Sequence, residues 1–281
     1  MTKLKKIVLT GAAGNLGGVL RKPLTVMCES LVSSDIAESV DNLANNESYV
    51  KADLGDLPAV STLLDGAEMV VHFGAIPDEA EWEKILHSNF LGAYNVWEAA
   101  YRHKLRRVVY ASSIHAVGMY SKNEFIDTAA PHRPDTFYGL SKCFAEDLGR
   151  MYWEKRQLES VCLRIYSCTP TPQNARALGS WLSYDDLIQL VERCISTPVT
   201  GFAVAWGISN NDRAPVDNSL AAFLGYKPKD NAEDYAEQVF AKTPVLDPTD
   251  AANMCHGGPF AVVPLGESGV AAMKRMSRGE N

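Results

Sequence analysis

The stretch "TFYGLSKCFAEDL" holds a tyrosine and a lysine, Tyr138 and Lys142, four positions apart in a segment with helical character. On a helix this spacing puts both side chains on one face, and Asp135 is the expected N-cap. Of the eleven tyrosines, only Tyr138 has a lysine at the fourth position. A nearby ammonium favours the phenolate, which free tyrosine, with a pKa of about 10, hardly forms at neutral pH. The pair therefore suits the removal of a proton from an alcohol while hydride leaves the same carbon.

A glycine-rich stretch, "TGAAGNLGG", lies between the first strand-like run and a helix and has the pattern T-G-x-x-G-x-x-G. Gly11, Gly14 and Gly17 permit a tight turn and let the backbone approach a pyrophosphate, while the helix N-terminus attracts the phosphates. Asp35 follows 18 residues beyond Gly17, near the position of a carboxylate that hydrogen-bonds the adenine ribose diol. The stretch "SSDIAES" has no Arg or Lys to pair with a 2′-phosphate, and Asp35 would repel one. NAD is therefore expected rather than NADP.

Short β-branched runs alternate with longer amphipathic ones along the first two-thirds of the chain. This order is typical of βαβ units, in which helices cover both faces of a parallel sheet. We expect an α/β fold, a Rossmann-type doubly wound parallel sheet with a small C-terminal substrate-binding portion. Parallel strands end at one edge, so the hydroxyls of "ASSIHAVG" are expected where ligands bind such sheets. The expected strands are 6–10, 30–35, 48–54, 68–75, 106–113 and 160–167, and the expected helices are 15–27, 79–103 and 136–156.

After residue 167 the alternation loosens into a Pro-rich loop, "CTPTPQNARALG". A helix-like stretch, "SYDDLIQLVERCIS", and a strand-like one, "GFAVAWGIS", follow it. We expect a single Rossmann-type domain over residues 1–281, with an NAD-binding core in 1–167 and a substrate-binding portion with closing elements in 168–281.

Composition and charge argue against several classes of protein. The 281 residues are 46% apolar and 22% charged, which is typical of a soluble globular chain. A net charge of -7 leaves no excess of Lys and Arg for nucleic acid or an anionic membrane, and no apolar run approaches the roughly 18 residues that span a bilayer. The N-terminus lacks the features of a secretory signal, so a cytoplasmic protein is expected. The six cysteines form no CxxC pair and lie near no histidine at zinc spacing, so neither a disulfide nor a metal is expected.

Together "TGAAGNLGG", Asp35, "ASSIHAVG" and "YGLSK" resemble the extended short-chain dehydrogenase/reductase superfamily. Ser113, 25 residues before Tyr138, matches the serine of its catalytic triad, which Tyr138 and Lys142 complete, and Asn89 matches its helix asparagine. The stretches "RIYSCTPTPQNARALGSWLSYDDL", "AWGISNND" and "LGYKPKDNAED" are similar to uronate dehydrogenases. The resemblance implies NAD-dependent oxidation of galacturonate or glucuronate at the anomeric carbon to an aldaric acid lactone, with Tyr138 as general base and Lys142 on the nicotinamide ribose.

The same resemblance implies substrate contacts by His115, Ser167 and Arg176. A guanidinium at Arg176 can clamp a hexuronate carboxylate through two parallel charge-assisted hydrogen bonds. Other interpretations stay open. Arg176 could be a solvated loop residue and His115 a structural histidine near a core strand, and Asp53 could cap a helix rather than accept from the adenine amine.

The predicted site consists of three overlapping sets of residues. The catalytic residues are Ser113, Tyr138 and Lys142. The expected substrate contacts are Ser113, Ile114, His115, Tyr138, Ser167 and Arg176. The expected NAD contacts are Gly11, Gly14, Asn15, Leu16, Gly17, Asp35, Asp53, Leu54, Phe73, Gly74, Ala75, Asn89, Tyr138 and Lys142.

Two positions depart from the uronate dehydrogenase pattern, since Pro77 stands where a serine is usual and Ile114 where an asparagine is usual. Both changes replace a polar side chain by an apolar one, so an NAD-dependent dehydrogenase of a neutral aldose is the nearest alternative. A nucleotide-sugar epimerase or dehydratase would use the same triad but needs a larger substrate lobe. An NAD-sensing binding protein would need the glycines and Asp35 but no base, and the complete triad argues against it. A homo-oligomer is expected, since relatives associate through helices on this type of sheet.

Overall fold

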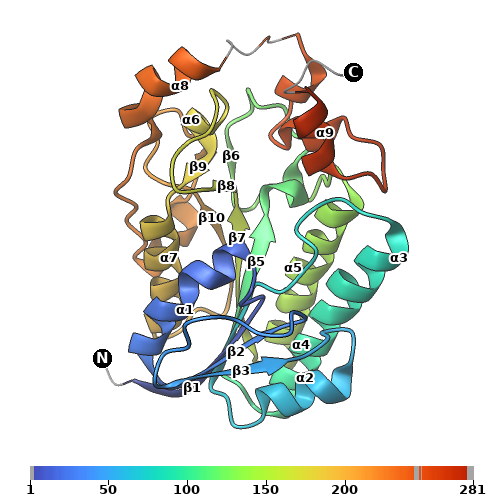
Figure 1. The fold of residues 1–281 in the computed structure, drawn as a ribbon, viewed down its shortest axis with the longest axis vertical. Helices are drawn as coiled ribbons and strands as arrows, with labels where there is room; N and C mark the ends of the chain where they lie inside the picture. The colour runs from blue at the N-terminus through green and yellow to red at the C-terminus, as the bar shows by residue number, and fades with distance from the viewer. Residues whose placement is uncertain (1–2, 244–246, 248, 277–281) are drawn as a thin grey trace.

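The computed structural model describes residues 3–243, 247 and 249–276. Its centre is a seven-stranded sheet with helices on both faces, and every pair of neighbouring strands is parallel (Figure 1). The strands are β1 (Leu4–Thr10), β2 (Cys28–Asp35), β3 (Glu47–Lys51), β4 (Met69–His72), β5 (Arg107–Ser113), β7 (Glu159–Ile165) and β10 (Phe202–Gly207). Their order is β3-β2-β1-β4-β5-β7-β10, so the chain builds outward from β1 and then returns to β4 beside it. The expected Rossmann-type doubly wound sheet is confirmed.

Two helical layers cover the sheet. One holds α1 (Asn15–Met27) and α7 (Tyr184–Ser196), and the other holds α2 (Leu57–Leu64), α4 (Gly92–Arg102) and α5 (Phe137–Arg156). Successive side chains of a strand point to opposite faces, so Ile7 and Leu9 of β1 pack in the first layer and Val8 packs in the second. Because both faces are buried at the centre of the sheet, β1, β4 and β5 contain continuous apolar runs, such as "IVL", "MVV" and "VVY".

Two helical segments differ from the sequence expectations. The segment expected as one helix over 79–103 is divided into α3 (Trp82–Ile85), a π-helical stretch (Leu86–Leu91) and α4. Asn89 is the buried residue of the π-helical stretch, and such stretches are frequent at functional sites. The eight-residue α2 was not expected, because two turns with a proline in the first one give little periodic signal.

The starts of two helices are capped by residues other than those considered. Thr136, not Asp135, is the N-cap of α5, and its hydroxyl accepts from an N–H of the first turn at 2.9 Å. Asp56, not Asp53, is the N-cap of α2. Short polar residues near a helix start can all serve as caps, and the backbone conformation decides which of them reaches the first N–H groups. Asp135 and Asp53 are thus free to bind other groups.

Residues after 167 are partly built into the sheet. Helix α7 packs beside α1, and β10 pairs with β7. The division at residue 167 into an NAD-binding core and a substrate-binding portion stays a prediction. The shorter elements include β6 (Ile126–Asp127), β8 (Ser167–Cys168), α6 (Ala177–Ser180), β9 (Trp181–Leu182), β11 (Val216–Asp217), α8 (Ala236–Lys242) and α9 (Gly269–Met276). Helices α8 and α9 lie at the end of the molecule toward which β5 and β7 point (Figure 1).

The described part of the chain contains no helix that is long and apolar enough to span a bilayer. Within the same residues, His, Cys, Asp and Glu side chains form no group of three or more that could hold a metal ion. The six cysteines are free thiols, and all of them except Cys255 are buried.

Candidate active site

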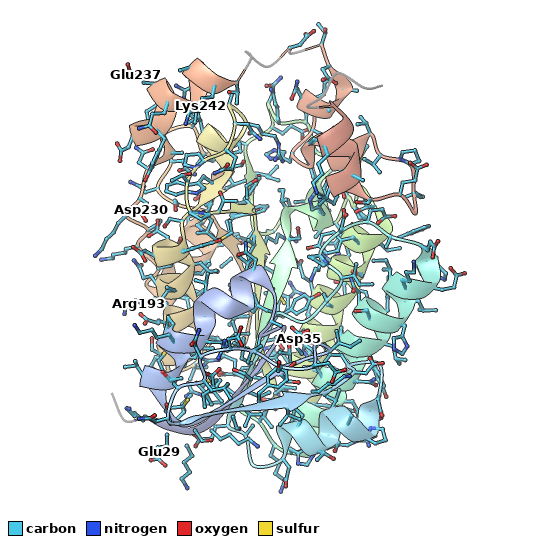
Figure 2. All side chains as sticks on the ribbon, in the orientation of Figure 1. Glu29, Asp35, Arg193, Asp230, Glu237 and Lys242 are labelled. Carbon is cyan, nitrogen blue, oxygen red and sulfur yellow. The ribbon has the colours of Figure 1, made fainter. Side chains whose placement is uncertain are left out.

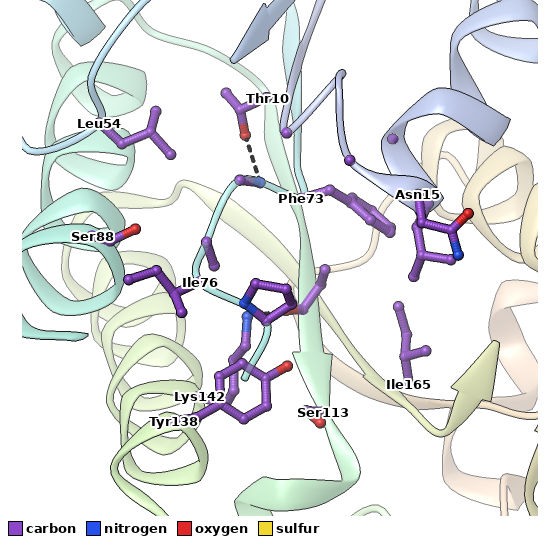
Figure 3. A pocket seen from close by; sticks show the side chains of 18 of the residues that line it. Thr10, Asn15, Leu54, Phe73, Ile76, Ser88, Ser113, Tyr138, Lys142 and Ile165 are labelled. Atoms are coloured by element: carbon purple, nitrogen blue, oxygen red, sulfur yellow. Dashed lines mark hydrogen bonds between the residues drawn. The ribbon is translucent and has the colours of Figure 1, made fainter. Parts of the chain in front are cut away.

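A cavity of about 1100 Å³ opens at the carboxyl ends of β1, β2, β4, β5 and β7. It lies where the strand order reverses, between β1 and β4, which is where doubly wound sheets bind ligands. Figure 3 shows Thr10 and Leu54 at one end of the cavity and Ser113 and Tyr138 at the other. All residues predicted to contact NAD or substrate line this cavity, with the exception of Asn89.

The glycine-rich loop brings backbone close to backbone at one end of the cavity. Gly11 has a φ of 75°, and a Cβ there would lie 2.5 Å from the carbonyl carbon of Phe73. A Cβ on Gly17 would lie 1.9 Å from the Gly11 oxygen, so only glycine fits. Helix α1 then starts at Asn15 without a side-chain cap in the described structure, which leaves its first N–H groups for an anion. This cradle suits a pyrophosphate.

Asp35 and Ser34 end β2 beside this loop, and Figure 2 labels Asp35 near the centre of the molecule. The Asp35 carboxylate accepts from the N–H of Ala13 at 3.0 Å and of Ile36 at 2.8 Å. Ser34 is 1% exposed, and its hydroxyl has no hydrogen-bond partner among the described residues. An unpaired buried hydroxyl next to a carboxylate matches what a ribose diol offers. The residues present therefore fit the adenosine half of NAD.

Asp53 also lines the cofactor end of the cavity, and it binds His87, which was not among the predicted site residues. Its carboxylate lies 2.9 Å from His87 Nε2 and accepts from the Gly55 N–H at 2.8 Å, and the His87 contact lowers the pKa of the carboxyl. A Cβ on Gly55 would lie 2.3 Å from the His87 ring, so this glycine leaves room for the imidazole. His87 sits in the π-helical stretch, and no sequence motif signals its contact with Asp53.

The three predicted catalytic residues meet at the other end of the cavity. Ser113 is the last residue of β5, and Tyr138 and Lys142 lie one turn apart in the first part of α5 (Figure 3). The Lys142 ammonium donates to the Ala111 carbonyl at 2.8 Å and lies 5.2 Å from the centre of the Tyr138 ring. Tyr138 is only 8% exposed, so its phenol lies in a largely dehydrated position.

Burial controls the protonation of this pair. It raises the pKa of Tyr138 to about 12, although a hydrogen bond from the Ser113 side chain lowers it. It also lowers the pKa of Lys142 to about 7, because the ammonium loses its water. The prediction that Lys142 and the positive nicotinamide together favour the phenolate stays a prediction, and in the protein alone burial keeps the phenol protonated at neutral pH. Desolvation outweighs the attraction of an ammonium that lies beside the ring rather than at the hydroxyl.

His115 forms one wall of the catalytic end and is held on two sides. Its Nδ1 lies 2.7 Å from the Asp135 carboxylate, which can only accept, so this nitrogen carries the proton and Nε2 stays available. The ring of Phe260 stacks on the imidazole, with ring centres 4.1 Å apart. Asp135, the residue expected as a helix cap, therefore orients His115.

Arg176 directly precedes α6, and its side chain lines the cavity, as does Ser167 of β8. One guanidinium nitrogen donates to the His256 carbonyl, and burial lowers the pKa of the side chain. Gly258, with a φ of 62°, makes room for it, since a Cβ there would lie 2.6 Å from Arg176 Nε. The remaining N–H groups of the Arg176 guanidinium can still donate to an anion.

Tyr166 also lines the cavity and binds His256, which does not line it, and neither residue was predicted. His256 Nε2 lies 3.0 Å from the Glu124 carbonyl and so carries the proton, which makes Nδ1 the acceptor for the Tyr166 hydroxyl at 2.8 Å. Phe260, His256 and Gly258 come from a part of the chain more than 110 residues after Tyr138. No local motif links these residues to the catalytic triad.

Two positions give this end an apolar character. Ile114 is 4% exposed and packs with Tyr166 and Trp206 in an apolar cluster, yet it also lines the cavity. Pro77 lines the cavity beside Ile76 on the loop that follows β4. A sugar hydroxyl that faces these side chains finds no side-chain hydrogen-bond partner there.

The fold and the site define the class of the protein. The chain belongs to the NAD dependent epimerase/dehydratase family, whose model matches residues 7–172. It is 44% identical over 262 residues to the uronate dehydrogenase of Pseudomonas putida, across 93% of this chain and 97% of that one. The uronate dehydrogenase of Agrobacterium fabrum is also 44% identical, across 93% and 98% of the two chains.

Solved structures give the same result. A mutant of the Agrobacterium tumefaciens uronate dehydrogenase in complex with NAD superimposes with a TM-score of 0.90. It is 44% identical and covers 92% of this chain and 98% of its own. The family and this structure agree with the prediction of NAD as the cofactor.

Proposed function

We propose that this protein is an NAD-dependent uronate dehydrogenase, which oxidises the anomeric carbon of a cyclic hexuronate such as galacturonate or glucuronate to the aldaric acid lactone. Its membership of an NAD-dependent family and its similarity to uronate dehydrogenases over nearly the full chain support this activity. The observation that carries the proposal is the meeting of Ser113, Tyr138 and Lys142 with Arg176 in one cavity.

In the proposed reaction Tyr138 takes the proton of the anomeric hydroxyl, and Ser113 orients the oxygen by a hydrogen bond. The O–H and C–H bonds break, the carbonyl of the lactone forms, and the C–H electron pair leaves as hydride. When bound, NAD supplies the nicotinamide ring that accepts the hydride. With NAD bound, Lys142 would hold the ribose, and its charge together with that of the ring would counteract the burial that raises the pKa of Tyr138 to about 12.

Arg176 and Ser167 bind the other end of the sugar. Arg176 is the only arginine among the described residues that line the cavity, and it is half-buried, where a charge-assisted hydrogen bond is strong. His115 contributes Nε2 to a hydroxyl near the reacting carbon, because Asp135 occupies its other nitrogen. These contacts hold the anomeric hydrogen in position for transfer.

The test is NAD reduction at neutral pH with galacturonate, glucuronate, galactose and L-arabinose supplied in parallel. Turnover of the two uronates with little turnover of the neutral sugars is the expected result. A preference for galactose or L-arabinose would instead support a neutral aldose dehydrogenase, the alternative that Pro77 and Ile114 favour. Purified protein that retains NAD and turns over none of the four sugars would favour a nucleotide-sugar enzyme.

We also infer that the protein works as a cytoplasmic homo-oligomer. Six free thiols suit a reducing compartment. Helices α4 and α5 expose large apolar side chains, among them Tyr94, Tyr101 and Met151, on the face away from the sheet, which suits association. Light scattering on the purified protein tests this inference, and a monomer at micromolar concentration would contradict it.

A further inference from the structure

The loop between β4 and α3 carries a buried carboxylate, Glu79, that the proposed mechanism does not use. Glu79 is 1% exposed. Its Oε2 accepts from the Tyr138 N–H and its Oε1 accepts from the Gly266 N–H, both at 2.8 Å. One side chain thus joins the start of α5 to the C-terminal segment, defined here as residues 255–269.

The contact to Tyr138 holds the backbone of the residue that carries the phenol. Tyr138 is the second residue of α5, so its N–H has no acceptor within the helix. The Thr136 hydroxyl accepts a hydrogen bond from the N–H of Gly139, and the Glu79 carboxylate accepts one from the N–H of Tyr138. With both bonds in place the first turn is fixed. Without Glu79, the N–H of Tyr138 would be buried without a partner or would shift toward another acceptor.

The loop itself is held in place by Asn89, which explains the position of this residue outside the cavity wall. The Asn89 side chain accepts from the Ile76 N–H at 2.9 Å and donates to the Ile76 carbonyl at 3.1 Å. It also donates to Ser141 in α5 at 3.1 Å. Asn89 therefore fixes the loop at Ile76, and Glu79 follows only three residues later.

The contact to Gly266 holds the segment that packs against His115 and Tyr138. This segment supplies Phe260, which stacks on His115 and packs in one apolar cluster with Tyr138. The neighbouring residue Asp78 also binds this part of the chain, through the N–H of Gly269 at 2.9 Å and the Ser268 hydroxyl, and its Oδ1 accepts from the Glu79 N–H at 2.8 Å. Figure 1 shows α9, which starts at Gly269, at the end of the molecule near α3 and α5.

We propose that Glu79 is a positioning residue that fixes the Tyr138 backbone and the C-terminal segment relative to each other, so that the phenol and His115 face the same reacting carbon. This inference rests on the proposed function for its kinetic test. Asp78→Asn provides a matched control, because the Asp78 side chain holds the C-terminal segment and has no hydrogen bond to α5 in the described structure. The amide oxygen of the asparagine can still accept from the Glu79 N–H, which Asp78 binds at 2.8 Å.

The kinetic test compares Glu79→Gln with Asp78→Asn on the sugar that the wild type oxidises best, unlabelled and deuterated at the anomeric carbon. We expect kcat of Glu79→Gln to fall about tenfold and its isotope effect to rise, because misplacement slows the chemical step. Asp78→Asn should keep kcat within about twofold and raise KM instead. An unfolded fraction would lower kcat but leave the isotope effect unchanged. Equal isotope effects in the wild type and Glu79→Gln would overturn the proposal.

Hydrogen exchange tests the same contact without any substrate. Glu79→Leu, which removes both acceptor oxygens, should speed the exchange of the Tyr138 and Gly266 amides together, whereas Asp78→Asn should speed that of Gly269 but not that of Tyr138. Unchanged exchange at Tyr138 in Glu79→Leu would overturn the proposal. If the wild type oxidises none of the sugars, the proposed function fails, and the exchange at these amides decides the inference alone.

Discussion

The two ends of the cavity are built in different ways. The cofactor end consists largely of backbone from one short stretch, the glycine-rich loop and the uncapped start of α1, with Asp35 beside it. The catalytic end consists of side chains from distant segments, among them Ser113, Tyr138, Arg176 and Phe260. The difference indicates that single substitutions can change the sugar chemistry without affecting the binding of NAD, because the two ends share few supporting contacts.

Exposure also separates the two ends. At the cofactor end, the side chains of Asp53 and His87 are 45% and 56% exposed, so solvent weakens their attraction. At the catalytic end, the side chain of Asp135 is fully buried and that of His115 is 13% exposed. Charges at the catalytic end therefore interact strongly, and changes there should have the larger effects.

Tyr138→Phe should give the largest difference between the two ends, because it should abolish most of the catalysis and leave NAD binding nearly unchanged. We expect kcat to fall about 1000-fold, because general-base catalysis is lost while the ring still packs. The dissociation constant for NAD, measured by calorimetry, should stay within about threefold of the wild type, since of the expected NAD contacts only the Tyr138 hydroxyl is removed. A variant that keeps most of its activity would show that another group accepts the proton.

Arg176→Ala should affect only the sugar. We expect kcat/KM for galacturonate or glucuronate to fall about 100-fold, because two charge-assisted hydrogen bonds to the carboxylate are lost. Turnover of a neutral aldose should change little. Arg176→Lys keeps the charge without the planar fork, so partial recovery is expected. An equal loss on neutral and acidic sugars would mean that Arg176 acts on the fold instead of the carboxylate.

Acid should weaken the support of the catalytic end. Glu146 of α5 is buried and binds Arg164 at 2.8 Å, His132 at 2.9 Å and the Ser112 hydroxyl. Although burial opposes ionisation, these partners lower the pKa of Glu146 from 4.5 to about 2. A lowered folded-state pKa stabilises the fold above the unfolded value, and this contribution is lost as the pH falls from 4.5 toward 2.

The expected loss for Glu146 is about 2 kcal/mol by roughly pH 3, or about thirtyfold in the unfolding equilibrium. Urea unfolding followed at about pH 6 and pH 3 measures it. Glu146→Gln, which has no charge to lose, serves as the control. The same acid dependence in this variant would assign the loss to other groups.

Asp35→Ser should give the smallest of these effects, at the cofactor end. We expect the dissociation constant for NAD to rise about tenfold, because a hydrogen bond from the ribose to a carboxylate is lost. Affinity for NADP should improve, since the repulsion of a 2′-phosphate is removed. Calorimetry with both nucleotides gives the ratio. An unchanged preference for NAD would mean that other parts of the cavity exclude the phosphate.

Much of the fold could be predicted because it depends on local patterns. The helix expected over 15–27 is α1 with the same bounds, and the six expected strands match strands of the sheet within a few residues. Their β-branched runs and the glycine-rich turn carry strong local signals. The short α2 and the π-helical break before α4 have no such signal, because they depend on how the segment packs.

The cap of α5 shows the limit of local reasoning. Asp135 and Thr136 are both good N-cap residues, and the sequence cannot rank them. In the folded protein the Asp135 carboxylate instead binds His115 Nδ1 at 2.7 Å. Gly118 and Gly257 leave room for this carboxylate, because a Cβ on either glycine would occupy its place. The preference thus arises from segments up to 120 residues distant from Asp135.

The sequence by itself determined the parallel sheet and NAD as the cofactor, and it predicts which side chains react. Each of these depends on residue types at short spacing, such as the glycines, Asp35, and the tyrosine and lysine one helical turn apart. Only the tertiary structure decided the state and the surroundings of those side chains. Burial, which lowers the pKa of Lys142 to about 7 and keeps Tyr138 protonated in the protein alone, arises from packing between distant segments. The contacts of Glu79, Tyr166 and His256 arise in the same way, and local spacing carries no information about them.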